Sequence, residues 1–187
     1  LYAAILRTPH PNSKIENVDI SRAEKMPGVM AVITGNSPEA DYQWPYSKEY
    51  KTKLFDSHCR FEGAPVAAVA AETPQQARDA ARVITVDYDV LDFVVDEQKA
   101  LEAGSHKVHS GGNTVKTETY SRGDVEKGFA EADVVMEENY RTAWELHTPL
   151  AIPGCVGKWE RDWPTIWGAI QGIYAMGFSE IWQGQEL

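Results

Sequence analysis

The chain has 187 residues, of which 43% are hydrophobic and 25% charged, a composition typical of a globular protein rather than of a disordered one. Its formal net charge of −10 argues against nucleic-acid binding, because such proteins concentrate Lys and Arg on one face and no basic cluster occurs here. No apolar stretch approaches the roughly 20 residues that a membrane-spanning helix requires. The two cysteines, Cys59 and Cys155, have no metal-ligand spacing, so we expect a reduced cytoplasmic protein that binds neither nucleic acid nor membrane.

The first third of the chain predicts short strands separated by loops. Residues 2–7 form a strand-like run that is followed by a longer loop. Residues 21–24 (Ser-Arg-Ala-Glu) are spaced as a capping box, which predicts a short helix ended by the Pro-Gly pair at 27–28. A second strand is expected at 29–34. Residues 35–59 lack clear periodicity, which indicates a long excursion with its aromatic side chains folded back and without a predicted helix.

The stretch 60–82 predicts a loop, a buried strand and a helix in direct succession. The unbroken run of small apolar residues at 66–71 is typical of a strand that is covered on both faces and central in its sheet. Thr73 is a suitable N-cap, Pro74 fits the first helical position, and Gln76 completes a capping box. Three small side chains at helical spacing are expected to pack this helix on the sheet: Ala77, Ala80 and Ala81.

The pattern then changes from helical to alternating, which predicts a strand at 84–90. Its inner face is expected to carry Ile84, Val86, Tyr88 and Val90. Residues 102–122 are rich in turn formers and poor in apolar anchors, so we expect a linker there. The linker divides the chain into a first domain at 1–101 and a second domain at 123–187.

The second domain is expected to begin with a short helix and to continue as strands. Asp124 can cap this helix. Its inner face is expected to carry Val125, Phe129 and Ala132. A strand is predicted from 133 to 141, and a hairpin is predicted about residues 161–162. Strands and helices in both domains together predict the α+β fold class.

Five blocks of the sequence together carry a resemblance to a known family. The blocks are LYAAILRTPHP at 1–11, PGVMAVIT at 27–34, RFEGAPVAAVAA at 60–71, GDVEKGFAEADVV at 123–135, and Gln171-Gly172. In order and spacing they resemble the molybdenum-binding subunit of the molybdenum hydroxylases, the family of xanthine dehydrogenases, aldehyde oxidases and CO dehydrogenases. The resemblance implies an α/β hammerhead domain followed by an incomplete α+β molybdopterin-binding region.

Two places depart from the family pattern. Ala64 stands where the family usually has Glu, and residues 151–153 (Ala-Ile-Pro) stand where an acidic residue and then a polar or basic one are usual. The resemblance therefore assigns no cofactor or substrate contact to residues 151–153.

The resemblance implies an N-terminal fragment of an oxidoreductase. The complete enzyme would hydroxylate an aldehyde or an N-heterocycle, or oxidise CO, with oxygen derived from water. Its cofactor would be a molybdenum-molybdopterin, with iron-sulfur clusters and FAD on partner subunits or domains. The remainder of the molybdenum-binding subunit would carry the main pterin-binding loops and a catalytic glutamate. The fragment alone is therefore expected to hold no molybdenum and to be inactive.

Within this chain, the resemblance assigns cofactor contacts to Gln171 and Gly172, and it assigns no catalytic residue and no metal ligand. The matching glutamine hydrogen-bonds an oxygen ligand of the molybdenum, which an amide N–H₂ can do without adding charge. The structural alternative for Gln171 is a side chain satisfied by neighbouring backbone after a strand. Gly172 would permit a close backbone approach or form a simple turn.

Two other interpretations of the sequence remain open. Glu145, His147 and Cys155 can be drawn as a Cys/His/Glu hydrolase, although nothing supplies an oxyanion hole. The whole chain can instead be a non-catalytic scaffold or binding module that kept a hammerhead fold. His106 and His109 are too few for a metal site and are expected to be solvated.

Overall fold

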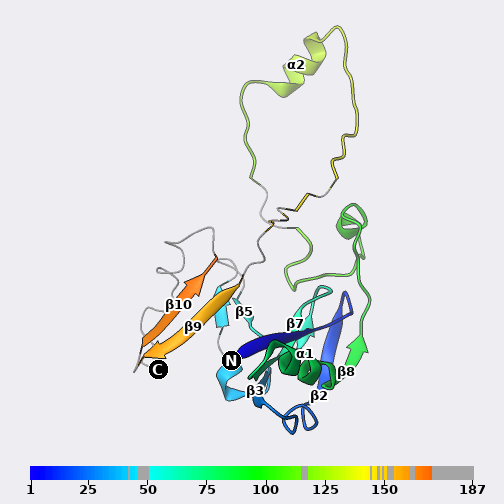
Figure 1. Cartoon of the computed structure of the whole chain (residues 1–187). Helices are drawn as coiled ribbons and strands as arrows, with labels where there is room; N and C mark the ends of the chain where they lie inside the picture. Colours follow the sequence, from blue (N-terminus) through cyan, green and yellow to red (C-terminus); the bar gives the residue numbers. More distant parts are fainter. Residues whose placement is uncertain are drawn as a thin grey trace. The chain divides into compact units, whose positions relative to one another are not determined.

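The structure of the chain, a computed structural model, describes residues 1–41, 43–45, 51–114, 118–143, 145, 146, 148, 150, 154–160 and 163–169 (Figure 1). The chain divides into two compact units, Leu1–Thr117 and Glu118–Leu187. Short strands and a few helices in these units confirm the α+β class. Neither of the two described α-helices has the length and apolar character that a bilayer span requires.

The first unit is built around a three-stranded antiparallel sheet with the order β1-β7-β3. Its strands are β1 (Tyr2–Arg7), β3 (Val29–Thr34) and β7 (Pro65–Ala71). Val69 of β7 lies opposite Ala4 on one side and Val32 on the other, and Val69 is 0% exposed. The prediction of a central buried strand at 66–71 is therefore confirmed, as are the predicted outer strands.

Helix α1 (Pro74–Arg82) follows β7 directly and begins as predicted. Thr73 Oγ1 accepts a hydrogen bond from the Gln76 backbone N–H (3.2 Å), and the Thr73 hydroxyl donates to Gln76 Oε1 (2.8 Å). Three alanines of the helix are buried: Ala77, Ala80 and Ala81. Ala80 and Ala81 share one cluster with Val69 of β7, because small side chains let the helix approach the sheet closely.

The N-cap of α1 gives a stability prediction. Thr73→Ala removes the side-chain oxygen that accepts from the Gln76 N–H, so we expect the free energy of unfolding to fall by about 1 kcal/mol. Denaturant titration followed by circular dichroism measures the change. Glu72→Ala, at the exposed position just before the cap, is the control. Equal losses in both variants would show that the cap contributes nothing.

A second antiparallel sheet, with the order β6-β2-β8, packs against β7. Its strands are β2 (Ser13–Asp19), β6 (His58–Cys59) and β8 (Thr85–Val90). Val66 of β7 packs with Cys59 and Ala64 against partly buried side chains of this sheet, Ile15, Val18, Val86 and Tyr88. Val18 and Val86 of this sheet also pack against the cluster that contains Ala80 and Ala81, so the two sheets and α1 share one core.

The predicted alternation at 84–90 is confirmed except at its end. Ile84 is buried, and Val86 and Tyr88 are half-buried, as predicted. Val90 is 54% exposed, because it is the last residue of the strand.

Strand β2 lies where the sequence predicted a loop. Ile15 and Val18 face the core, but a register shift between Ile15 and Asn17 breaks the two-residue period that identifies a strand. The polar residues between and around them made the segment look like a loop.

The helix predicted at 21–28 is wrong. The segment forms consecutive turns, with hydrogen bonds from the Glu24 N–H to Ile20 O (3.1 Å) and from the Met26 N–H to Ala23 O (3.1 Å). Asp19, not Ser21, supplies the first side-chain acceptor, to the Ser21 N–H (2.9 Å). The segment before Pro27 is too short to form the hydrogen bonds that would offset the unfavourable free energy of helix nucleation.

The segment 35–59 holds short elements. They are η1 (Pro38–Ala40), β4 (Gln43–Pro45) and β5 (Lys51–Lys53), and the last two pair as an antiparallel ladder. Phe55 is 3% exposed, which confirms for this residue the expectation that aromatic side chains fold back.

The second unit contains α2 (Val125–Glu131) and a hairpin of β9 (Cys155–Glu160) with β10 (Trp163–Gly168). Asp124 caps α2 as predicted, because its Oδ1 accepts from the Lys127 N–H (3.0 Å). The pairing of Glu160 with Trp163 confirms the hairpin about residues 161–162, which themselves lie outside the described part of the chain.

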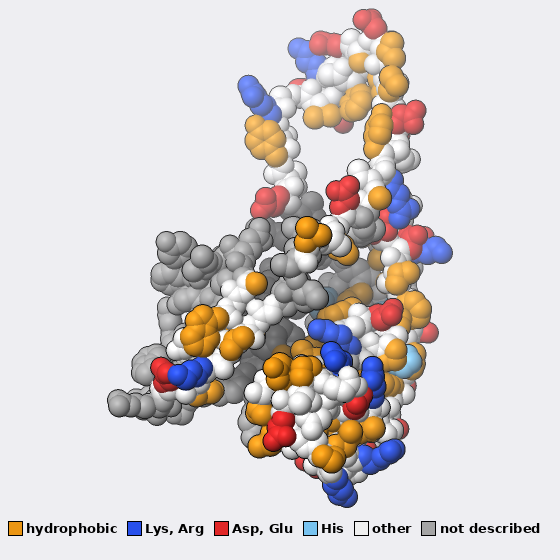
Figure 2. All heavy atoms as spheres, in the orientation of Figure 1, with side chains coloured by type: hydrophobic (Ala, Val, Ile, Leu, Met, Phe, Trp, Pro, Cys, Tyr) orange, Lys and Arg blue, Asp and Glu red, His pale blue; other side chains and the backbone are white. Residues whose placement is uncertain are grey.

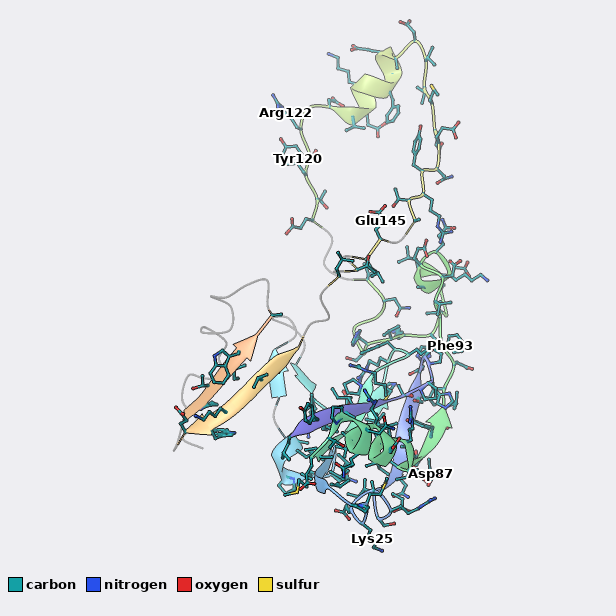
Figure 3. All side chains as sticks on the ribbon, viewed as in Figure 1. Lys25, Asp87, Phe93, Tyr120, Arg122 and Glu145 are labelled. Atoms are coloured by element: carbon teal, nitrogen blue, oxygen red, sulfur yellow. The ribbon has the colours of Figure 1, made fainter. Side chains whose placement is uncertain are left out.

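Two predictions for the second unit are wrong. Val125 and Phe129, expected on an inner face of α2, are 60% and 59% exposed, and Figure 2 shows hydrophobic side chains on the surface of this helix. Residues 133–143 do not form a strand, because no described segment pairs with them. Tyr120 and Arg122 lie on the segment before α2 (Figure 3), and Tyr120 is 86% exposed.

Candidate functional site

The predicted cofactor contacts, Gln171 and Gly172, lie outside the described residues. The structure describes the strand pair that leads to them. β10 ends at Gly168, and the Ala169 N–H still donates to Gly154 O (3.1 Å), so the pairing continues to the last described residue. Gln171 follows two residues later, and its role stays a prediction.

The surface that leads to Gln171 is apolar and uncovered. Pro164 is half-buried, and every other residue of the second unit whose side chain the structure describes is exposed. On the hairpin, Trp167 lies opposite Val156, and Trp159, Trp167 and Val156 are each at least 56% exposed. Trp167 and Val156 lie on one face of the hairpin and Trp159 on the other, because side chains alternate along a strand. A two-stranded hairpin without a covering layer is marginally stable, and exposed apolar surface marks a contact site. The described part of this unit therefore lacks a core of its own.

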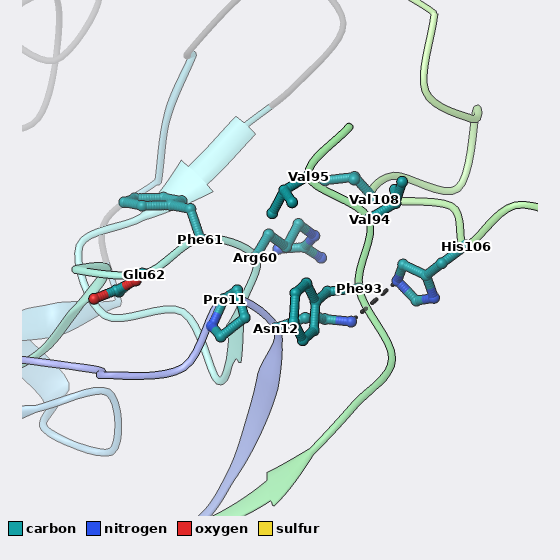
Figure 4. Close-up of a pocket in the computed structure, with 10 residues that line it drawn as sticks. All are labelled: Pro11, Asn12, Arg60, Phe61, Glu62, Phe93, Val94, Val95, His106 and Val108. Atoms are coloured by element: carbon teal, nitrogen blue, oxygen red, sulfur yellow. Dashed lines mark hydrogen bonds between the residues drawn. The ribbon is translucent and has the colours of Figure 1, made fainter. Parts of the chain in front are cut away.

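A polar cluster in the first unit centres on Asn12, which is 4% exposed (Figure 4). Asn12 Nδ2 donates to the Asp92 carbonyl oxygen (2.5 Å) and to His106 Nε2 (3.0 Å). Asn12 Oδ1 accepts from His58 Nε2 (2.9 Å). One buried amide thus joins the start of β2, strand β6 and the segment after β8. The expectation that His106 is solvated is wrong.

The segment after β8 is held by a second asparagine. Asn113 Nδ2 donates to Ala100 O (2.9 Å), in the short helix η2 (Lys99–Leu101), and to His106 O (2.7 Å), and its Oδ1 accepts from the Val108 N–H (2.8 Å). Asn113 therefore closes the loop whose His106 contacts Asn12.

A cavity of about 290 Å³ lies beside the Asn12 cluster. Its walls include Phe61, Phe93, Val94 and Val95, with Arg60 among them (Figure 4). Arg60 Nη1 donates to Asp56 Oδ2 (3.1 Å) and to His58 O (3.1 Å). The Arg60 charge is therefore matched by a carboxylate, and the cavity holds no reactive nucleophile.

Burial sets the chemistry of the titratable groups around the cluster. Burial, and then the positive charge of Arg60, lower the pKa of His58. Burial raises the pKa of the Cys59 thiol, so Cys59 stays protonated and unreactive. These groups stabilise the fold and do not form an acid–base pair for catalysis.

The hydrolase interpretation gains no support from the described residues. His147 lies outside them, and no hydrogen bond joins Glu145 to Cys155, which is an exposed free cysteine on β9. Over the same described part of the chain, no group of three or more His, Cys, Asp or Glu side chains could hold a metal ion.

The lowered pKa of His58 predicts a pH dependence of stability. Because folding disfavours the protonated ring, the contribution of His58 is complete above its ordinary pKa of 6.5 and is lost as the pH falls through the lowered value. We expect the free energy of unfolding to fall more steeply below pH 6.5 in the wild type than in His58→Gln, which keeps a donor for Asn12. Denaturant titrations across this pH range measure both slopes. Identical slopes would contradict the burial effect.

Comparison with known proteins identifies both parts of the chain. Residues 1–92 match the a/b hammerhead domain of aldehyde oxidase and xanthine dehydrogenase, and residues 106–178 match the molybdopterin cofactor-binding domain. The chain belongs to the molybdenum hydroxylase family.

Molybdenum hydroxylase sequences similar to this chain are subunits of larger enzymes. This chain is 35% identical over 162 residues to a probable xanthine dehydrogenase subunit of Bacillus subtilis, and the match covers 87% of this chain and 22% of that protein. It is 30% identical over 142 residues to the nicotinate dehydrogenase large molybdopterin subunit of Eubacterium barkeri, covering 76% of this chain and 33% of that subunit. The chain therefore spans between a fifth and a third of the length of these relatives.

Solved molybdenum hydroxylase structures share the fold. Quinoline 2-oxidoreductase of Pseudomonas putida 86 superposes with a TM-score of 0.79 at 26% identity, covering 93% of this chain and 24% of that one. Aldehyde oxidoreductase of Desulfovibrio gigas gives a TM-score of 0.60 at 26% identity, covering 71% of this chain and 16% of that one. The hammerhead expectation from the sequence is confirmed.

Proposed function

We propose that this chain contributes the hammerhead domain and the first part of the molybdopterin-binding domain to the molybdenum-binding subunit of a hydroxylase. The complete enzyme oxidises a small-molecule substrate, an aldehyde, an N-heterocycle or CO, with oxygen derived from water. The observation that carries the proposal is the match to both domains in one order over most of the chain. Relatives named as xanthine, nicotinate and CO dehydrogenase subunits support the reaction class.

We propose domain limits of 1–101 and 123–187, with residues 102–122 as the linker. One observation supports a boundary in this interval: the chain divides into compact units between Thr117 and Glu118. The family matches put the boundary earlier, since the hammerhead match ends at residue 92 and the cofactor-binding match begins at residue 106.

The cofactor proposed for the complete subunit is molybdenum-molybdopterin, which supplies a redox metal centre when bound. The donor chemistry of the chain fits a hydrogen-bonding role toward it. An amide such as Gln171 donates its Nε2–H without adding charge, and the described residues contain no cluster that would ligate a metal directly. In this proposal Gln171 donates to an acceptor atom of the bound cofactor, and Gly172 lets the backbone approach it.

The proposed partners are the remainder of the molybdenum-binding subunit and iron-sulfur and FAD subunits or domains, in the cytoplasm. The uncovered apolar side chains of the second unit support the first of these, because they need a covering layer. The name of one relative, the gamma subunit of a dehydrogenase complex in Paenarthrobacter nicotinovorans, supports a multi-subunit assembly.

The source of the oxygen tests the proposed reaction. The complete assembly is supplied with each substrate class and an artificial electron acceptor in H₂¹⁸O. Incorporation of ¹⁸O from water into one product class supports the proposal. An assembly that oxidises none of the three classes would favour the alternative, a scaffold that kept the hammerhead fold without catalysis.

A further inference from the structure

Strand β1 is an open edge of the β1-β7-β3 sheet. It has one neighbour, β7, so backbone N–H and C=O groups of alternate β1 residues point away from the sheet. Tyr2 and Ile5 are 54% and 46% exposed along this edge. Proteins normally protect such edges with a charge or a proline, and the only such residue of β1 is Arg7 at its end.

A groove of about 220 Å³ runs between this edge and helix α1. Ile5 and Ala81 contribute apolar walls, and three arginines line it, Arg7, Arg78 and Arg82. No acidic residue lines it, although the whole chain carries a net charge of −10. Over β1 and α1, Figure 2 shows hydrophobic side chains with Lys or Arg side chains beside them. The groove is therefore a local cationic feature on an acidic protein.

The arginines keep binding capacity. Arg7 Nη1 donates to Gly63 O (2.8 Å) and Arg78 Nη2 donates to Gln75 Oε1 (3.4 Å), so both meet neutral oxygens at these contacts. Arg82 Nη1 pairs with Asp79 Oδ1 (2.9 Å), and the Arg82 side chain is 70% exposed. A guanidinium has five N–H donors, so each of the three arginines can donate hydrogen bonds to a further carboxylate.

We propose that the β1 edge and the arginines of α1 form a docking surface for an extended acidic segment of a partner polypeptide. The segment adds a strand to β1 by backbone hydrogen bonds, and its acidic side chains meet the arginines. The spacings agree. Arg78 and Arg82 are four residues apart on one helix face, about 5–6 Å between Cβ atoms, and alternate residues of a strand are about 6.5 Å apart.

The other outer strand, β3, is also uncharged over 29–34, but it contributes no residue to the arginine-lined groove. A polypeptide fits the β1 surface better than a nucleic acid, since an open strand edge pairs with backbone amides and the net charge repels phosphates. The proposal concerns the first unit alone and does not depend on the proposed function.

The test uses the full 187-residue chain and a fluorescent seven-residue peptide in which Glu alternates with Val. We expect binding at low salt that added salt weakens. Arg78→Gln/Arg82→Gln should weaken it by about tenfold, as expected for the loss of two exposed charge pairs. The matched control is Arg22→Gln/Lys25→Gln, which removes two exposed cations outside the groove and should leave affinity unchanged. Circular dichroism verifies that both variants fold.

A second probe separates strand addition from charge attraction. The same peptide, N-methylated at alternate residues, keeps its charge but cannot pair along one edge, and it should bind at least tenfold more weakly. Equal affinity of the methylated peptide, equal losses in the two double variants, or no binding of the first peptide would each overturn the proposal. So would a chain that is dimeric alone and becomes monomeric in Arg78→Gln/Arg82→Gln, because the edge would then serve a second copy. Tighter binding of a single-stranded oligonucleotide than of the peptide would also overturn it.

Discussion

Gln171→Ala in the complete assembly is expected to lower turnover about 100-fold, because removal of one preorganised hydrogen-bond donor at a reacting centre has an effect of this size. Molybdenum content should stay near that of the wild type, since the amide donates to the cofactor without being its main support. Steady-state kinetics and metal analysis of the same preparation measure the two quantities.

The combination of the two readouts separates the roles of Gln171. A structural glutamine would lower stability and molybdenum content together, or change nothing. Gln98→Ala, an exposed glutamine of the first unit, is the matched control and should leave both quantities unchanged. Full turnover of Gln171→Ala at normal molybdenum content would remove Gln171 from the site.

Ala81→Arg is expected to destabilise the first unit by about 3–5 kcal/mol, because it places a charge without a partner in the core. Ala81 is 7% exposed and belongs to the cluster that joins α1 to β7. Ala81 borders the groove that Arg78 and Arg82 also line, so the local charge is already positive, and no carboxylate lines the groove. Thermal and denaturant unfolding of the full chain measure the loss.

Gln75→Arg is the matched control, because it adds the same side chain to the same helix at an exposed position. Its effect should stay within about 0.5 kcal/mol. A melting temperature of Ala81→Arg that equals that of Gln75→Arg would contradict the burial of Ala81.

The parts of the fold that the sequence predicted are those where local signals agree with each other. At 66–82, the apolar run, the Thr73 cap and the alanine spacing all favour one strand followed by one helix, and the structure contains both. The capping residue Asp124 was found for the same reason, since the cap is a local interaction.

The wrong predictions concern features that depend on distant residues. A register shift hides the period of β2, whose pairing with β8 is set by residues some 70 positions away. The sequence did not predict a role for Asn12, because a single asparagine before a strand matches no motif. Its partners His58 and His106 come from distant segments. A strand was predicted at 133–141, but a strand forms only where another segment pairs with it, and no described segment pairs with these residues.

The candidate site was reached only through the family resemblance. No spacing rule distinguishes Gln171 from a glutamine that is satisfied by backbone after a strand. The groove between β1 and α1 gave no signal either, because Arg7 lies about 70 residues from Arg78 and Arg82 and only the fold brings them to one place.

The molybdenum content of two preparations, the isolated chain and the complete assembly that contains it, tests the central claim most directly. We predict stoichiometric molybdenum with hydroxylase activity in the assembly, and neither in the isolated chain, because this chain spans between a fifth and a third of the length of its relatives. Stoichiometric molybdenum and activity in the isolated chain would contradict its role as one part of a larger cofactor-binding subunit. An assembly without molybdenum would contradict the proposed function itself.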